Sequence, residues 1–340
     1  MNGDTGDGGA DYDAIQFNFL QSVNIDLATG VASLVGGSGS GTFTNFEAAT
    51  IFGAGGAIVS GTNGSNNMFV RGTGNTITLL DGNDNVELDS GGNFIDGGAG
   101  TTDSVKFNTS ADVIVDLSLP VGSTDIGGLI GTITGFEVIR TGSGNDNITG
   151  TSSDDRVEVD TGNDIVSTGS GADLIFVNDG GDTLDGGAGL NDTLFVTTTD
   201  DVTADISIPL GTLQIGGDAL STINGIENIT SGSGNDTLIG GAGVSVLLGQ
   251  DGNDMIFGGD GNDAIRGGNG MDTLFGGAGN DQIQGGADSD TADYSGANSI
   301  DYIINNLGGG DWTVTEIATS DFDTLTSIET LHFDDMDFFA

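Results

Sequence analysis

The sequence has no cysteine, no long apolar run and only five basic residues. Without cysteine there are no disulfides and no thiol chemistry, and without a stretch of eighteen apolar residues there is no transmembrane helix. The chain has five lysine and arginine residues and 51 aspartate and glutamate residues, so its formal net charge is −46. Because this charge repels polyanions, we predict no nucleic-acid partner and no membrane insertion.

Residues that usually carry catalysis are also scarce. With a single histidine, His332, the chain cannot form an HExxH zinc site, and a Ser-His-Asp triad would depend on that residue alone. There is neither a GxSxG motif nor an EF-hand pattern with its closing glutamate. Abundant aspartates leave a carboxylate pair acting on polysaccharide as an alternative. Since aspartates committed to a cation are poor acids, we predict that this chain is not an enzyme.

What the sequence does contain is a nine-residue period. Residues 231–293, the third ladder, divide without gaps into seven rows of nine, with glycine favoured at places one, two and four. Place eight is apolar in every row, and Ser245 alone departs from aspartate at place six. The sixth-place aspartates are Asp236, Asp254, Asp263, Asp272, Asp281 and Asp290. A fixed period of this kind predicts stacked, similar coils.

Two further stretches follow the same pattern. In the second ladder, residues 141–185, place six is always aspartate: Asp146, Asp155, Asp164, Asp173 and Asp182. The first ladder, roughly residues 51–96, is degraded, with Gly56, Thr76 and Asn93 near the expected carboxylate places and only Asp84 well placed. We predict that it keeps the coil shape through asparagine and threonine contacts.

The row pattern itself predicts a metal site. Glycines permit tight turns, and the last three places form a short strand with place eight inward. Stacked coils lie roughly 4.7 to 4.9 Å apart, which brings like-charged aspartates close together. A hard divalent cation relieves their repulsion, and calcium suits a turn rich in carboxylates and carbonyls better than magnesium does. A flexible glycine-rich linker would not require this spacing, and no glycine motif follows a strand and opens a helix as in a nucleotide site.

These rows resemble the RTX (repeats-in-toxin) nonapeptide family, GGxGxDxUx. The resemblance implies a parallel β-roll in which two rows form one coil and calcium lies between the turns of rows i and i+2. It implies ligation by the eleven sixth-place aspartates and by carbonyls of places one and three. Those carbonyls belong to Gly249, Asp251, Gly258, Asp260, Gly267, Asn269, Gly276 and Ala278.

The resemblance also implies which aspartates pair. The predicted pairs are Asp236 with Asp254, Asp254 with Asp272, Asp272 with Asp290, Asp263 with Asp281, Asp146 with Asp164, Asp164 with Asp182, and Asp155 with Asp173. Ser245 lacks a carboxylate, so the site that it would share with Asp263 is expected to be weak or empty. The degraded first ladder is likewise expected to bind little calcium.

A longer repeat of about 90 residues runs through the chain. Glycine-rich openings at Gly8, Gly97, Gly186 and Gly285 are each followed by an apolar cluster around one glutamate: Glu47, Glu137, Glu227 and Glu329. We expect each glutamate to satisfy a backbone turn or to face solvent, with metal ligation as the alternative. The predicted solenoid units are residues 1–96, 97–185 and 186–293, followed by residues 294–340. The alternating segments 113–119 and 202–208 predict wider coils with loops around Pro120 and Pro209.

The last segment, residues 294–340, resembles the closing segment of RTX proteins. The resemblance implies that it caps the last coil and carries an uncleaved export signal, ending in an acidic residue and three apolar ones, Asp337, Phe338, Phe339 and Ala340. The N-terminal residues have no Sec-type signal. Three alternatives stay open at this point: a cytosolic protein, export by another route, or a piece of a longer chain that has a catalytic domain upstream.

The prediction as a whole is an all-β parallel β-roll, or β-solenoid, built of nonapeptide calcium ladders with wider intervening coils and a C-terminal cap. We expect several Ca²⁺ ions and folding outside the cell after passage through a type I secretion apparatus, which places the protein in the extracellular medium or on the bacterial cell surface. The alternative is an acidic adhesion or surface-layer module that binds carbohydrate or other cells. Aromatic residues make up only 6% of the chain, too few to favour an exposed sugar-binding row.

Overall fold

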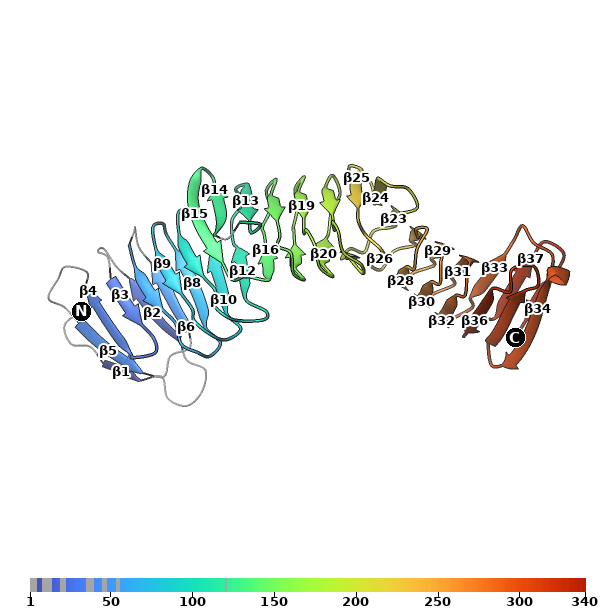
Figure 1. Cartoon of the computed structure of the whole chain (residues 1–340), viewed down its shortest axis with the longest axis horizontal. Coiled ribbons are helices and arrows are strands. Elements are labelled where there is room, and N and C mark those ends of the chain that lie inside the picture. The colour runs from blue at the N-terminus through green and yellow to red at the C-terminus, as the bar shows by residue number, and fades with distance from the viewer. Residues whose placement is uncertain are drawn as a thin grey trace. The chain divides into compact units, whose positions relative to one another are not determined.

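The computed structural model describes residues 5–7, 14–18, 23–34, 40–44, 48–52, 56–119 and 121–340. The chain divides into two compact units, Met1–Gly169 and Ser170–Ala340, which we call the N-terminal and C-terminal halves. Regular structure in the described residues is β-strand apart from one short 3-10 helix, η1 (Ser299–Asp301). In each half the strands form two sheets whose members lie side by side (Figure 1).

The two sheets of the N-terminal half take alternate stretches of the chain. The first sheet contains β1 (Thr5–Asp7), β3 (Val23–Asp26), β4 (Val31–Leu34), β5 (Ser40–Thr44), β7 (Ile58–Ser60), β9 (Thr76–Thr78), β11 (Phe94–Asp96), β13 (Val113–Asp116), β14 (Gly122–Ile126), β15 (Leu129–Thr134), β17 (Asn147–Thr149) and β19 (Ile165–Ser167). The second contains β2 (Ala14–Asn18), β6 (Ala48–Phe52), β8 (Asn67–Arg71), β10 (Asn85–Leu88), β12 (Ser104–Phe107), β16 (Val138–Arg140) and β18 (Arg156–Glu158).

The C-terminal half is built in the same way. One sheet contains β21 (Thr183–Asp185), β23 (Val202–Asp205), β24 (Gly211–Ile215), β25 (Ser221–Asn224), β27 (Thr237–Ile239), β29 (Met255–Asp260), β31 (Thr273–Ala278), β33 (Thr291–Tyr294), β37 (Thr330–Phe333) and β38 (Asp337–Phe339). The other contains β20 (Leu174–Val177), β22 (Thr193–Val196), β26 (Asn228–Thr230), β28 (Val246–Asp251), β30 (Ala264–Asn269), β32 (Gln282–Ala287), β34 (Tyr302–Gly308), β35 (Asp311–Glu316) and β36 (Phe322–Thr326).

Successive rows of the third ladder go to opposite sheets, and rows two apart pair in parallel. Leu238 of β27 lies opposite Ile256 of β29, which lies opposite Leu274 of β31. On the other sheet Leu247 lies opposite Ile265 in the same way. Two rows therefore make one coil, and the predicted parallel β-roll is confirmed.

The core is the column of eighth-place side chains. Leu238, Leu247, Ile256 and Leu274 are fully buried, whereas their neighbours at places seven and nine are not. This follows from the alternation of side chains across a strand, and it confirms the predicted inward place. Each row contributes one aliphatic contact to the core, so a row has little to bury until it is stacked on another.

Strands of the third ladder are longer than predicted. The pattern predicts three residues, yet β28, β29 and β30 have six and run on to place three of the next row. Pairing continues there, with Gln250 opposite Gly268 and Asp251 opposite Asn269. Glycine has no Cβ, so the backbones of neighbouring turns can approach closely enough to extend the ladder of hydrogen bonds. In the second ladder, β17 and β19 keep the predicted three residues.

The segments predicted as wider coils are different in the structure. β13, β14 and β15 form an antiparallel meander, and so do β23, β24 and β25. The turn from β14 to β15 is formed by Gly127 and Gly128, whose φ angles are 58° and 87°. Two consecutive left-handed residues make the tight hairpin turn that matches strand twist. The meander joins the roll by parallel pairing of β15 with β11 and of β13 with β17. Pro120 lies outside the described residues.

The 90-residue repeat has a structural counterpart. Each strand that follows a glycine-rich opening pairs in parallel with the strand of the next glutamate cluster: β2 with β6, β12 with β16, β22 with β26, and β33 with β37. The four openings therefore start equivalent coils. The boundaries of the predicted solenoid units stay predictions.

Residues 294–340 close the roll. β36 pairs in parallel with β32, and β37 with β33, so these two strands form a last coil. Antiparallel strands then follow on both sheets, β34 and β35 on one and β38 on the other. The Trp312 indole is buried and its Nε1–H donates to the Ile328 carbonyl at 2.9 Å. The predicted cap thus covers the end of the core with an aromatic side chain and an antiparallel edge.

Candidate metal centre

The sixth-place aspartates are the most deeply buried charged residues of the ladders. All eleven predicted ligands have at most 3% of their surface exposed: Asp146, Asp155, Asp164, Asp173, Asp182, Asp236, Asp254, Asp263, Asp272, Asp281 and Asp290. Each lies in the turn directly before a strand. The strand's own alternation therefore points place six toward the interior, in line with place eight.

In most of these carboxylates one oxygen is held by the backbone of the neighbouring coil, whereas Asp155 Oδ2 accepts the N–H of Thr151 in its own row. The Asp236 N–H donates to Oδ1 of Asp254 at 2.8 Å, and the Asp254 N–H donates to Oδ1 of Asp272 at 2.9 Å. The same bond joins three other predicted pairs, namely Asp272 with Asp290, Asp263 with Asp281, and Asp146 with Asp164. The structure thus brings these predicted partners together through backbone and side chain. The pairs of Asp155 with Asp173 and of Asp164 with Asp182 stay predictions, because the two members of each lie in different halves.

The second oxygen has no such partner. Oδ2 is buried and accepts no hydrogen bond in Asp146, Asp236, Asp254, Asp263, Asp272, Asp281 and Asp290. A buried, unsatisfied carboxylate oxygen costs about 1 to 3 kcal/mol or more, since water no longer solvates it. One such oxygen recurs in each successive coil, and a column of these oxygens fits the donor set that a divalent cation requires.

Glycine at place one makes room for this oxygen. A Cβ on Gly249 would collide with Oδ2 of Asp254 and would lie 2.9 Å from the Gly267 carbonyl oxygen of the next coil. A Cβ on Gly258, Gly267 or Gly276 would collide in the same way with Oδ2 of its own row's aspartate. The space left by the missing side chain is therefore bounded by a carboxylate oxygen and a carbonyl oxygen, both of which are hard ligands.

The three recurring glycines have different tasks. From residue 249 to the end of the third ladder, places two and four adopt positive φ angles, such as 132° at Gly268 and 130° at Gly252, which L side chains rarely adopt. Gln250 and Asp288 stand at these places in two rows and are held at a φ of 78°. Place three, with Asp251, Asp260, Asn269 and Ala278, is exposed, while the four place-one glycines are buried.

Burial raises the pKa of the ladder carboxyls. Burial, with like-charged neighbours, raises the pKa of Asp254 to about 7. The pKa values of Asp263 and Asp290 rise to about 6 for the same reasons, and those of Asp146, Asp236, Asp272 and Asp281 rise mainly through burial. Backbone N–H bonds to Oδ1 offset only part of this effect. The buried carboxylates are therefore not balanced by an equal number of positive charges in the interior of the roll.

Side chains alone do not complete a metal site. Within the part of the chain that the structure describes, no group of three or more histidine, cysteine, aspartate or glutamate side chains could hold a metal ion. Two carboxylates from each pair of rows, together with carbonyls of the turns, match the mixed oxygen shell that calcium accepts. They match zinc poorly, because zinc prefers nitrogen and sulfur.

A second polar column, at place five, was not predicted from the sequence. The Asn253 N–H donates to Oδ1 of Asn235 at 2.9 Å, and the Met271 N–H donates to Oδ1 of Asn253 at 2.7 Å. The bond from Asn280 to Asn262 repeats this arrangement. These asparagines satisfy the turn backbone beside the aspartate column. The signal was available, since asparagine occupies place five in four rows of the third ladder.

The first ladder is an asparagine column. Asn66, Asn75, Asp84 and Asn93 are buried at its sixth places. Asn93 Oδ1 accepts the Asn75 N–H at 3.0 Å, and Asp84 Oδ1 accepts the Asn66 N–H at 2.6 Å. The predicted asparagine contacts are therefore present. Beside Thr76, the acceptor is Asn75, whose Oδ1 accepts the Ala57 N–H at 3.2 Å.

Three recurring glutamates satisfy backbone turns, as expected. Glu137 Oε2 accepts the Asp103 N–H at 2.9 Å, Glu227 Oε2 accepts the Asp192 N–H at 3.0 Å, and Glu329 Oε2 accepts the Asp290 N–H at 2.8 Å. Asp103 and Asp192 are fully buried and were not predicted as site residues. Glu47 lies outside the described residues.

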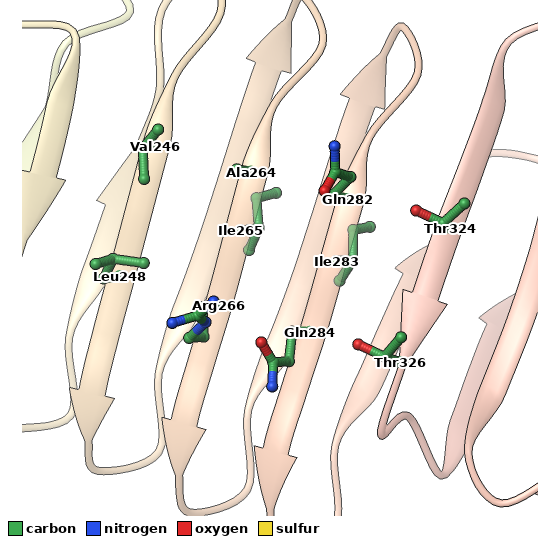
Figure 2. Close-up of a pocket in the computed structure, with 10 residues that line it drawn as sticks. All are labelled: Val246, Leu248, Ala264, Ile265, Arg266, Gln282, Ile283, Gln284, Thr324 and Thr326. Atoms are coloured by element: carbon green, nitrogen blue, oxygen red, sulfur yellow. The ribbon is translucent and has the colours of Figure 1, made fainter. Parts of the chain in front are cut away.

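A shallow groove lies on the outer face of the C-terminal half. Figure 2 shows its lining side chains on β28, β30, β32 and β36: Val246, Leu248, Ala264, Ile265, Arg266, Gln282, Ile283, Gln284, Thr324 and Thr326. None of the ladder aspartates is among them. The groove is thus separate from the aspartate columns.

The comparisons with known proteins agree with this geometry. Within the described residues, no helix is long and apolar enough to cross a membrane. No curated protein matches the chain. The family model of the RTX calcium-binding nonapeptide repeat (4 copies) matches residues 133–166, 158–194, 230–265 and 266–300, which together contain the whole of the second and third ladders. The second and third ladders thus match the RTX calcium-binding nonapeptide repeat, a repeat that binds Ca²⁺ at multiple sites, on a parallel β-roll.

Proposed function

We propose that this chain is the calcium-gated, non-catalytic part of an exported bacterial protein. In this proposal it stays unfolded in the low-calcium cytosol, passes through a type I secretion apparatus, and folds when it meets calcium outside. The observation that carries the proposal is the column of buried Oδ2 atoms without hydrogen bonds, in a chain of net charge −46. RTX repeats occur in secreted bacterial proteins, which supports the same reading.

The ions would bind between successive coils. We propose as side-chain ligands the eleven sixth-place aspartates, and as backbone ligands the carbonyls of places one and three. The convergence of Asp254 Oδ2 and the Gly267 carbonyl at Gly249 supports this assignment. Bound calcium would supply the positive charge that these carboxylates lack, while the chain's own turns orient the oxygens and exclude water from them.

Gating follows from the absence of the site in the unfolded chain. Without a cation, folding would bury several carboxylates, each at a cost of several kcal/mol unless protonated or paired. A ligand that binds only the folded state stabilises it by RT ln(1 + [L]/Kd), which is about 2.7 kcal/mol per site at a hundredfold excess over Kd. Export and folding would then respond to one variable, the free calcium concentration.

The C-terminal tail fits a signal that is accessible only before folding. In the folded cap, β38 pairs antiparallel with β37, and the Phe338 ring packs edge-on against Phe333 at 5.9 Å between centroids. The Ala340 N–H donates to the Glu329 carbonyl. Removing residues 337–340 is expected to stop export by a type I system while calcium-dependent folding of the purified chain persists. Export that survives deletion of residues 294–340 would show that the tail has no such role.

A calcium titration of the purified chain tests the central claim. β-sheet content by circular dichroism and hydrodynamic radius are followed together, from EDTA to millimolar calcium. We expect a cooperative gain of sheet with contraction of the chain. Identical spectra and radii in EDTA and in calcium would refute the proposal.

A matched pair of variants separates ligation from surface charge. Asp263→Asn removes a charge from the buried column, whereas Asp260→Asn removes one from an exposed side chain in the same row. The first is expected to raise the calcium midpoint by about tenfold, equivalent to about 1.4 kcal/mol. The second should leave it nearly unchanged, because exposed charges are screened by water and salt.

An adhesion module is the second candidate, and the groove in Figure 2 is the observation that favours it. There the exposed guanidinium of Arg266 lies among the amides of Gln282 and Gln284 and the hydroxyl of Thr326. Such groups hydrogen-bond sugar hydroxyls. Binding to a glycan panel that Arg266→Gln abolishes, in a chain that still folds with calcium, would support this candidate.

A further inference from the structure

Three rows of the chain have glutamate where the ladders have aspartate, and in each the turn is shortened. Between the strands of the third ladder, residues 240–245 make a six-residue turn from β27 to β28. The turns that contain Glu137, Glu227 and Glu329 have three residues each: 135–137 between β15 and β16, 225–227 between β25 and β26, and 327–329 between β36 and β37. A longer side chain in a shorter turn can reach the same neighbour.

Each glutamate carboxylate accepts the hydrogen bond that a sixth-place carboxylate accepts, whereas its own N–H makes a bond that the seventh-place N–H makes in the ladders. Its Oε2 accepts the N–H of an aspartate in the preceding coil, which is Oδ1's task in the ladders. Its own N–H donates back to the carbonyl of that aspartate, at 3.1 Å for Glu137, 3.2 Å for Glu227 and 3.1 Å for Glu329. The contacts are the same at all three positions, although their surroundings differ. We call these positions the Asp–Glu steps: Asp103 with Glu137, Asp192 with Glu227, and Asp290 with Glu329.

The aspartate of each step has a buried oxygen without a hydrogen bond. Asp103, Asp192 and Asp290 have no exposed surface, and Oδ2 of each is unsatisfied. The glutamate adds negative charge beside it, which contributes to the raised pKa of all three carboxyls. Two carboxylates thus face each other with no basic side chain between them in the contacts that the structure describes.

In two of the three steps, those of Asp192 and Asp290, the oxygen atoms converge as they do in the ladders. A Cβ on Gly285 would collide with both Oδ2 of Asp290 and the Ser327 carbonyl oxygen of the glutamate turn. A Cβ on Gly186 would lie 3.0 Å from Oδ2 of Asp192 and would collide with the carbonyl oxygen of Gly225, the equivalent first residue of its turn. The same pairing of carboxylate and carbonyl oxygens occurs at Gly249 in the third ladder.

We propose that the three Asp–Glu steps are additional calcium sites, each formed by the unsatisfied aspartate oxygen, the glutamate carboxylate and the first carbonyl of the shortened turn. The proposal rests on the calcium-binding assignment of the ladders and extends it to rows without the nonapeptide glycines. Calcium suits a shortened turn because a glutamate carboxylate can supply two ligand oxygens where carbonyls are missing. Each calcium column would thereby continue past the rows in which the Asp pattern breaks.

Ion counting with glutamine variants tests this. In the full chain, Glu137→Gln, Glu227→Gln and Glu329→Gln each keep an oxygen that can accept the aspartate N–H and remove only the charge. Bound calcium is counted by equilibrium dialysis with metal analysis, and affinity is measured by calorimetry. We expect each single variant to lose one ion and the triple variant to lose three. Glu87→Gln is the control, because Glu87 lies on β10 and accepts from Asn108 at the surface; its ion count should equal that of the unaltered chain.

The outcomes distinguish this proposal from the calcium-gated roll itself. If the glutamine variants fold in calcium with unchanged ion counts while Asp263→Asn loses an ion, the steps hold no calcium and the ladders still do. The unaltered chain provides a second readout that needs no variant to fold. It should bind three ions more than its sixth-place aspartate pairs provide, and a count equal to those pairs would overturn the proposal.

Discussion

The Tyr294 hydroxyl donates a hydrogen bond to Oδ2 of Asp323 at 2.9 Å, while Oδ1 of Asp323 accepts the Asp281 N–H at 3.0 Å. Asp323 thus accepts the Asp281 N–H in the same way as Asp281 accepts the Asp263 N–H. The second oxygen of Asp323, however, also accepts a hydrogen bond from the protein. Burial and the nearby carboxylate of Asp323 raise the pKa of Tyr294 well above its usual value, so the hydroxyl keeps its proton. At this end of the column the Tyr294 hydroxyl thus satisfies the second carboxylate oxygen of Asp323, whereas the corresponding oxygen of Asp281 accepts no hydrogen bond.

Removing that hydroxyl should loosen the cap. Tyr294→Phe leaves Oδ2 of Asp323 buried without a donor, which is expected to lower the free energy of unfolding by about 1 to 3 kcal/mol. The measurement is urea unfolding in saturating calcium. Tyr302→Phe is the control, because Tyr302 packs against Tyr294 but takes no part in this hydrogen bond. Equal stability of the two variants would contradict the assigned role of Tyr294.

Completing the broken row should add a site. Ser245 is buried at place six and its N–H donates to Oδ1 of Asp263 at 2.8 Å, as an aspartate's would. Ser245→Asp is expected to bind one more ion and to gain about 2.7 kcal/mol of stability at a hundredfold excess of calcium over Kd.

In EDTA the same variant should be less stable than the unaltered chain, because it buries one more carboxylate. This reversal of sign between calcium and EDTA distinguishes a metal site from a general effect on folding. Val244→Asp adds the same charge at a side chain that is 62% exposed in the same row. It should change neither the ion count nor the stability appreciably, and a similar response of both variants would argue against a site at Ser245.

We expect calcium binding to depend on the room that place one leaves for the carboxylate and not on the backbone freedom of glycine there. A Cβ on Gly267 would collide with the Asp272 carboxylate, and neither this residue nor Gly243 has a positive φ. Gly267→Ala is therefore expected to weaken calcium binding by about tenfold, or about 1.4 kcal/mol, by displacing a ligand oxygen. Gly243→Ala meets open space, and its calorimetric titration should match that of the unaltered chain. Comparable losses in both variants would mean that backbone freedom, and not room for the carboxylate, is what place one requires.

Acid should partly replace calcium. The pKa of Asp254 is raised to about 7 and those of Asp263 and Asp290 to about 6, chiefly by burial, whereas an aspartate in an unfolded chain titrates near about 3.9. The calcium-free folded form therefore binds more protons than the unfolded form between these values. Its stability is highest below about pH 4 and is lost as the pH rises through 6 and 7.

Two measurements check this pH dependence. In EDTA, circular dichroism should show more folded chain at about pH 5 than at about pH 8. In calorimetry, the calcium affinity should fall as the pH is lowered over the same range, because protons compete with the ion for the same oxygens. A calcium-free chain that folds better at about pH 8 would contradict the burial of neutral carboxyls.

The sequence was enough to predict the ladders, because their information is local and periodic. An aliphatic residue at every eighth place and aspartate at every sixth, as at Ile256 and Asp254, determine which side of each strand faces inward and where the carboxylates stack. The stacked coils and the inward eighth place followed from that period, while the rows that share a coil followed from the family resemblance. The place-five asparagines, Asn235 and Asn253, were visible in the same rows and could have been predicted by asking which groups satisfy the turn backbone.

Tertiary structure decided what depends on contacts between distant segments. That Asp290 meets Glu329, that Tyr294 reaches Asp323, and that β14 folds back as a hairpin between β13 and β15 are set by three-dimensional packing. No short period relates these residues, so the sequence pattern could not align them. A turn shortened from six residues to three also shifts the apparent row, which concealed that the recurring glutamates occupy the sixth place. Periodicity determines a repeated coil, whereas the places where repetition stops are decided by which side chains the final packing brings within reach.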